Sequence, residues 1–314
     1  MTLTPAFRAV DLISRGLARF GLMPDGHDLP KFSYEKRHNQ KPVRISLRPA
    51  PPGITTRDFT VPGRSGDIPV RSYARDAGTT GGGLLYLHGG GFVLGGLESC
   101  DHLLRDLADR TGLLIVSVDY RLAPEHPFPS GLNDGEDALL WFAKEASTLG
   151  VDPGRIAVGG DSAGGNLSAA LSLLARDTGG PAICAQILIY PLTDMSMEQA
   201  SWRECALPWL TTESAAPVRD AYCGTTDPLS PLISVLRAED LSGLPPALVQ
   251  TCEHDTLRDE GIAYAERLEA AGVPVRHTLY LGSPHGFLSV PRCAPNYYQA
   301  VNEIAEELRR RTAA

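Results

Sequence analysis

A serine lies between two glycines in the segment GDSAG, residues 160–164. Ser162 meets the G-x-S-x-G pattern where an apolar run, 155–160, joins a helix-like run, 166–177. A chain that turns from strand to helix within a few residues needs small side chains two positions before and after the turn, and it strains the backbone of the serine. The pattern predicts a nucleophilic hydroxyl lifted clear of a sheet. A tight turn filled with small residues is the alternative.

A serine nucleophile also needs backbone donors that hold the oxyanion formed during its attack. The segment HGGGF, residues 88–92, follows the apolar run 84–87, and its three glycines let backbone amides approach a ligand closely. The predicted donors are the amides of Gly90 and Gly91, with Gly89 as their neighbour, and the amide of Ala163. His88 is predicted to anchor this loop. A phosphate-binding loop is the alternative, but the segment has neither G-x-G-x-x-G nor a Walker lysine.

The serine further requires a base and a carboxylate that orients the base. His285 follows the last strand-like run, and Asp255 is the first carboxylate on the loop after the preceding strand-like run. The resulting order of serine, acid and histidine is the one used by α/β-hydrolase sheets. Asp259 and Glu260 open the next helix, where capping and the helix dipole are expected to explain them. A histidine on a surface loop, without a catalytic role, is the alternative for His285.

The elements that must position these groups alternate from about residue 82 onward. The apolar runs predicted to carry strands are residues 84–89, 113–120, 155–160, 185–191, 247–255 and 275–282, and the strand in the fifth run is expected to end at about Glu253. Predicted helices cover residues 102–112, 135–147, 168–177, 261–272 and 298–311. This alternation predicts an α/β fold with a mostly parallel sheet covered by helices on both faces.

Two segments depart from this rhythm and are predicted to form a small helical cap over the carboxyl edge of the sheet. The predicted divisions are N-terminal cap helices at 1–45, a first core part at 46–194, a cap insertion at 195–225 and a second core part at 226–314. Apolar residues recur every three or four positions from Leu3 to Phe20, which predicts an amphipathic helix packed on the protein, with contact to a membrane as the minor alternative. Trp202 and Trp209 lie in the insertion, where core packing is as good an explanation as substrate contact.

Together these motifs resemble the hormone-sensitive-lipase branch of the α/β-hydrolase fold, which includes many bacterial carboxylesterases. The resemblance rests on HGGGF at 88–92, DYRLAPEHPFP at 119–129, GDSAGGNL at 160–167, DPLSPL at 227–232, DTLRDEG at 255–261 and HGF at 285–287. It implies a triad of Ser162, Asp255 and His285 and a cap built from the N-terminus and an insertion. The DYRLAPE segment is interpreted as structural.

The expected activity is hydrolysis of short- to medium-chain carboxylic esters through an acyl-enzyme intermediate. An amidase or lactonase would use the same triad. A small-molecule receptor on this fold is the alternative from another class, and a metal hydrolase is disfavoured because the chain has no H-E-x-x-H motif. No cofactor and no metal are expected.

Composition limits the partners. The 314 residues carry a formal net charge of -8, which disfavours nucleic acid and anionic membranes as partners. Charged residues interrupt the first twenty positions, so neither a signal peptide nor an integral membrane span is expected. The six cysteines show neither C-x-x-C nor zinc spacing, which favours reduced thiols and a cytoplasmic location. The expected partner is a small-molecule ester, and a homodimer is left open.

Overall fold

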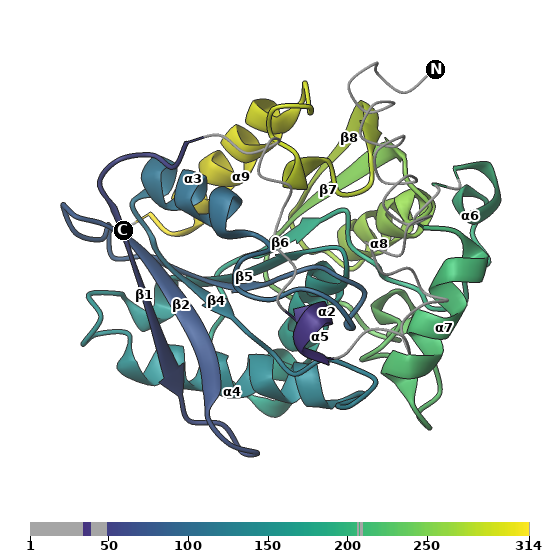
Figure 1. The fold of residues 1–314 in the computed structure, drawn as a ribbon, viewed down its shortest axis with the longest axis horizontal. Coiled ribbons are helices and arrows are strands. Elements are labelled where there is room, and N and C mark those ends of the chain that lie inside the picture. Colours follow the sequence, from purple (N-terminus) through teal and green to yellow (C-terminus); the bar gives the residue numbers. More distant parts are fainter. Residues whose placement is uncertain (1–33, 39–48, 206, 208–209, 314) are drawn as a thin grey trace.

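A computed structural model describes residues 34–38, 49–205, 207 and 210–313 of the chain. In this part, eight strands form one twisted sheet in the order β1-β2-β4-β3-β5-β6-β7-β8 (Figure 1). The strands are β1 (Ile54–Val61), β2 (Ile68–Arg75), β3 (Gly83–Leu87), β4 (Leu114–Val118), β5 (Ile156–Asp161), β6 (Gln186–Ile189), β7 (Ala247–His254) and β8 (Val275–Pro284).

The strands from β3 to β8 correspond to the six predicted runs and pair in parallel. The expectation of a mostly parallel α/β sheet is therefore confirmed. Sequence analysis missed β1 and β2, which add an antiparallel pair next to β4. Exposed and half-buried positions predominate in β1, so it lacks the continuous apolar run by which the central strands were recognised.

Helices cover both faces of the sheet (Figure 1). The helices α3 (Asp101–Thr111) and α9 (Tyr297–Arg311) pack on one face, and α4 (Ser130–Glu145), α5 (Ala163–Thr178) and α8 (Arg258–Ala270) pack on the other. Alternate side chains of β3 serve the two layers: Leu84 and Tyr86 belong to the core under α3 and α9, whereas Leu85 and Leu87 belong to the core under α4, α5 and α8. Burial on both faces explains the uninterrupted apolar sequence of this strand.

The predicted cap insertion contains two helices, α6 (Ser201–Glu204) and α7 (Thr212–Cys223). Trp202 is 2% exposed and packs with Met197, Ala215 and Leu257. Trp209 and the predicted helix between Leu3 and Phe20 lie outside the described residues. The short 3-10 helices are η3 (Pro153–Arg155), η4 (Val235–Arg237) and η5 (Phe287–Ser289).

Helix α2 (Tyr34–His38) joins the N-terminal region to two loops of the core. The guanidinium of Arg37 is buried and donates to the backbone oxygens of Val93 at 2.7 Å and Ala123 at 2.8 Å. It also pairs with the carboxylate of Glu125 at 2.6 Å. Because Ala123 and Glu125 lie in the DYRLAPE segment, these contacts give that segment the structural role expected from its sequence.

Candidate active site

The G-x-S-x-G segment forms a sharp turn between β5 and α5. Ser162 has φ 54° and ψ -117°, a strained combination for a residue with a side chain. A Cβ atom added at Gly164 would lie 1.9 Å from the Leu87 oxygen, and one added at Gly160 would lie 2.4 Å from the same oxygen. Both positions therefore require glycine. The need for small residues on either side of the turn was the reason given from the sequence for the two glycines.

A chain of hydrogen bonds joins the predicted nucleophile, base and acid. His285 Nε2 lies 2.9 Å from Ser162 Oγ, and His285 Nδ1 lies 2.8 Å from Asp255 Oδ2. The residues come from loops after β5, β7 and β8, whose carboxyl ends meet at one edge of the sheet. Asp255 is completely buried, and its other oxygen, Oδ1, accepts the Leu257 amide at 2.9 Å. One carboxylate oxygen is thus held by the backbone while the other faces the imidazole.

The glycine loop after β3 lies against the same cavity as Ser162. Gly90 and Gly91 adopt φ values of 123° and 60°, which favour glycine. The amide of Gly89 donates to Asp161 Oδ1 at 2.9 Å, so it is occupied within the protein. In the described part of the chain, no acceptor is bonded to the amides of Gly90, Gly91 or Ala163. Three of the four predicted donors are consequently available to a ligand.

Asp161 was not singled out from the sequence, although it directly precedes the serine. Its Oδ1 accepts the Tyr86 hydroxyl at 2.9 Å, the Gly89 amide at 2.9 Å and the Cys100 thiol at 3.3 Å. A charged residue ending an otherwise apolar strand was the available signal. This carboxylate joins the glycine loop to the serine turn.

His88 is fully buried beneath the glycine loop. Its Nδ1 lies 2.7 Å from the Gly89 oxygen, and its ring stacks on Tyr120 with centroids 4.3 Å apart. The Tyr120 hydroxyl donates to the His88 oxygen at 2.7 Å. Burial lowers the pKa of His88, which keeps the ring neutral at pH 7. These contacts agree with the expected anchoring of the loop.

The capping part of the explanation given to Asp259 and Glu260 is wrong, although both lie in the first turn of α8, where the helix dipole favours acids. Neither side chain caps this helix, which has no side-chain cap bond at its N-terminus. Asp259 instead accepts the Ser201 amide at 2.8 Å, and Glu260 accepts the indole N–H of Trp202 at 2.9 Å. Both carboxylates therefore connect α8 to α6, because donors from the cap insertion reach them in the folded chain.

A cavity of about 430 Å³ opens beside Ser162 and His285. Most of its wall is apolar, and it is formed by the loop after β3, the insertion at 195–225 and the loops after β6, β7 and β8. The large apolar residues in this wall are Phe92, Val93, Leu94, Tyr190, Leu192, Met195, Met197, Trp202, Leu210, Val218 and Leu257. Its size and lining are those typical of a site for a largely apolar small molecule.

Three further observations concern the described residues. They contain no group of three or more His, Cys, Asp or Glu side chains that could hold a metal ion. Among the same residues, no helix is both long and apolar enough to cross a membrane. All six cysteines are free thiols.

A serine on a strained turn, hydrogen-bonded to a histidine and through it to a carboxylate at the edge of a parallel sheet, is the arrangement found in α/β hydrolases. A family model described as the alpha/beta hydrolase fold matches residues 84–289. The chain therefore belongs to the α/β-hydrolase family, and the resemblance to the hormone-sensitive-lipase-like carboxylesterases is confirmed.

Curated relatives and solved structures agree with this assignment. The chain is 41% identical over 271 residues to the carboxylic ester hydrolase LipN of Mycobacterium tuberculosis. The matched region covers 82% of this chain and 70% of LipN. It is 36% identical over 285 residues to an arylesterase of Saccharolobus solfataricus, covering 90% and 93% of the two chains. A hyperthermophilic esterase from the archaeon Pyrobaculum calidifontis matches over 100% of both chains with a TM-score of 0.87 and 39% identity.

An ester hydrolase from the metagenome of Lake Arreo, solved with a derivative of bipyridine phosphonate, also matches over 100% of both chains. Its TM-score is 0.88 and its identity is 34%.

Proposed function

We propose that the chain is a serine carboxylesterase that hydrolyses carboxylic esters through an acyl-enzyme intermediate. The two curated relatives described above carry names of ester hydrolases. LipN is 41% identical to this chain, and the arylesterase is 36% identical. The observation that carries the proposal is the unbroken chain of hydrogen bonds from Ser162 through His285 to Asp255. These three residues are proposed as nucleophile, base and orienting acid.

In the first step, His285 Nε2 removes the Ser162 proton as the hydroxyl oxygen attacks the ester carbonyl carbon. Asp255 keeps the Nδ1 proton on the imidazole and stabilises the positive charge that develops there. The resulting oxyanion is received by the free amides of Gly90, Gly91 and Ala163. The amide of Gly89 is assigned a supporting role, because it is already bonded to Asp161.

Collapse of the tetrahedral intermediate breaks the bond to the alcohol, which takes the proton held by His285. Water then attacks the acyl-enzyme, with His285 again accepting a proton, and Ser162 is restored as the carboxylic acid leaves. No cofactor is needed for either step.

The substrate class is proposed to be small, mostly apolar esters of short to medium chain length. The size and apolar wall of the cavity support this assignment. The same triad could attack an amide or a lactone, so comparison of matched ester, amide and lactone substrates decides the scissile group.

A homodimer and a cytoplasmic location are also proposed. Strand β8 is at one edge of the sheet and exposes Leu279 and Leu281, by 37% and 57%. An exposed apolar edge strand favours pairing with a second chain. Sedimentation of the wild type beside Leu281→Lys tests the dimer, and a monomeric wild type would contradict it. Fractionation of the source cells tests the location.

The direct test is Ser162→Ala, with Ser147→Ala on an exposed surface position as the control. The first variant should lose several orders of magnitude in turnover of p-nitrophenyl acetate, and the control should retain it. The wild type should also show a burst of p-nitrophenol equal to its active sites. Near-normal turnover by Ser162→Ala would remove Ser162 from the proposed role.

A further inference from the structure

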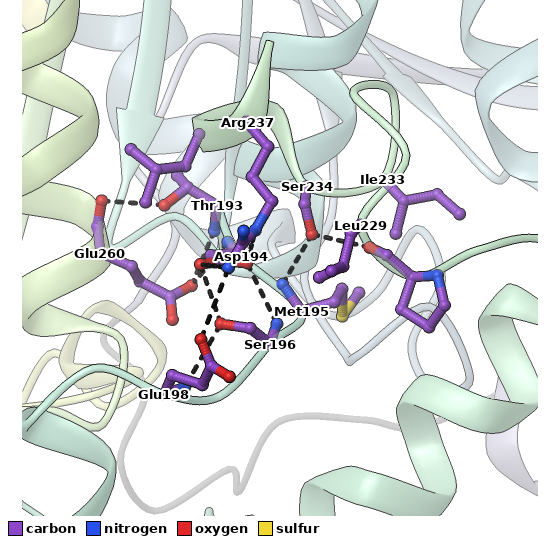
Figure 2. Close-up of polar contacts among 12 residues, drawn as sticks. Thr193, Asp194, Met195, Ser196, Glu198, Leu229, Ile233, Ser234, Arg237 and Glu260 are labelled. Carbon is purple, nitrogen blue, oxygen red and sulfur yellow. Dashed lines mark hydrogen bonds and ion pairs between the residues drawn. The ribbon is translucent and has the colours of Figure 1, made fainter.

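Three N–H groups from two distant segments converge on one buried carboxylate outside the triad. Glu260, fully buried in the first turn of α8, accepts the amides of Thr193 at 2.8 Å and Asp194 at 3.2 Å through Oε1 (Figure 2). Its other oxygen, Oε2, accepts the indole N–H of Trp202 at 2.9 Å. Glu260 thus joins the loop after β6 to helix α6 of the cap.

The loop after β6 is held from its other side as well. Asp194 forms a two-point ion pair with Arg237, with its oxygens 2.9 Å from Nε and 3.1 Å from Nη2 (Figure 2). The amide of Met195 donates to Ser234 Oγ at 2.8 Å. Contacts from η4 and from α8 therefore clamp the segment 193–195 between them.

Two of the three residues that donate to Glu260, Asp194 and Trp202, line the substrate cavity, and the third, Thr193, does not. Asp194, Met195 and Trp202 line this cavity, whereas Glu260 does not reach it. The Trp202 ring packs with Met197 and Leu257, which are also in the wall. No hydrogen bond or ion pair among the described residues joins the Glu260 side chain to Ser162, Asp255 or His285, so we expect its effect on the reaction to act through the cavity wall.

We propose that Glu260 is a positioning residue that sets the shape of the substrate cavity, and thereby the size of ester that the enzyme prefers. The physical reason is that its carboxyl group is the acceptor for three buried donors. A buried N–H group that loses its acceptor is costly, and the segment that carries it moves to find another. Without this carboxyl group, the loop at 193–194 and the Trp202 ring would leave the positions that shape the wall. This proposal rests on the esterase function proposed above.

The variants Glu260→Met and Glu260→Gln test it. Methionine has a similar length but removes both acceptors, whereas glutamine retains one oxygen for the backbone amides. The matched control is Glu198→Met, because Glu198 lies on the loop after β6 that Glu260 contacts, is 80% exposed, and among the described residues forms an ion pair only with Arg237, at 3.7 Å. The measurement is kcat and KM for p-nitrophenyl acetate and p-nitrophenyl octanoate, per active site titrated with a phosphonate.

Glu260→Met should lower the octanoate-to-acetate ratio of kcat/KM about tenfold, mainly through KM for octanoate, with kcat for acetate within about threefold of the wild type. The control should keep the ratio within about threefold, and Glu260→Gln should lower it less than Glu260→Met does, because glutamine keeps an acceptor for the two backbone amides but none for the Trp202 indole N–H. An unchanged ratio in Glu260→Met would overturn the proposal. So would an equal loss of kcat on both esters, which would indicate damage to the triad.

Trp202→Phe provides a second route to the same test, because it removes one donor and preserves an aromatic ring. Trp202→Phe alone should lower the octanoate-to-acetate ratio of kcat/KM. In the double variant with Glu260→Met it should lower this ratio by a smaller factor, because Glu260→Met already removes the bond between Trp202 and Glu260. If Glu260→Met fails to fold, an unchanged ratio in Trp202→Phe overturns the proposal. Failure of the esterase function itself would be seen separately, as a wild type without an acylation burst.

Discussion

The amide of Gly89 donates to Asp161 Oδ1 across 2.9 Å and so fastens the glycine loop to the residue before Ser162. The same oxygen accepts the Tyr86 hydroxyl at 2.9 Å. The free amides of the loop and the Ser162 hydroxyl are therefore positioned relative to one another before substrate binds. An oxyanion hole depends on such preorganised donors, because no energy is then spent on arranging them during the reaction.

Replacement of this acceptor should slow the chemical step. We expect Asp161→Ala to lower kcat by about tenfold or more with a smaller change in KM, since donors to the oxyanion act mainly in the transition state. Asp161→Asn retains an oxygen that can accept the Gly89 amide and should lose less. Steady-state kinetics with p-nitrophenyl acetate measures both, and identical losses in the two variants would contradict the importance of this bond.

The choice of acid can be tested with two neighbouring carboxylates. Asp255→Asn should lower kcat by a factor on the order of 10⁴, because an amide in this position favours the wrong imidazole tautomer. Asp259 accepts the Ser201 amide and is not bonded to His285, so Asp259→Asn should remain within about tenfold of the wild type. Comparable losses in the two would show that the acid is wrongly assigned.

The N-terminal helix α2 should contribute to stability through one guanidinium. Arg37→Met leaves the buried oxygens of Val93 and Ala123 without this donor and should lower the free energy of unfolding by about 2 to 3 kcal/mol. Glu125 is 42% exposed, so Glu125→Gln should cost less than about 1 kcal/mol. Urea denaturation compares the variants, and a neutral Arg37→Met would refute the argument.

Stability should depend on pH through Glu260. Burial is the largest influence and raises the pKa of this carboxyl from 4.5 to about 8, against the three N–H donors that favour its ionised form. Between these values the folded chain retains a proton that the unfolded chain has lost. The free energy of unfolding should therefore fall as pH rises from about 5 to 8, by at most about 1.4 kcal/mol per pH unit from this group.

Glu260→Gln should remove that contribution, because its amide does not titrate. The difference in free energy of unfolding between the wild type and this variant, measured in urea at pH 5, 6, 7 and 8, should decrease steadily with pH. Parallel stability curves for the two proteins would show that the pKa of Glu260 is not raised.

Local sequence was sufficient for much of the central architecture. The strands β3 to β8 could be predicted because each is an apolar run bounded by turn residues, and burial on both faces demands such runs. The fold then implied that residues following parallel strands meet at one edge, which made Ser162, Asp255 and His285 candidates for one site. The role of the glycines at 160 and 164 could also be predicted from the sequence, since a turn this sharp excludes a Cβ atom at both positions.

Other features depended on which distant segments meet. The strands β1 and β2 carry many exposed or half-buried residues, and their place next to β4 follows from pairing that no local pattern reveals. Glu260 resembles any acid at a helix start, yet its partners are 58 to 67 residues away in the chain. The sequence by itself determined which groups could react and which strands carry them. Only the tertiary structure decided that the Gly89 amide is occupied and that Glu260 supports the cavity wall, because hydrogen-bond partners are selected by proximity in space after the core has packed.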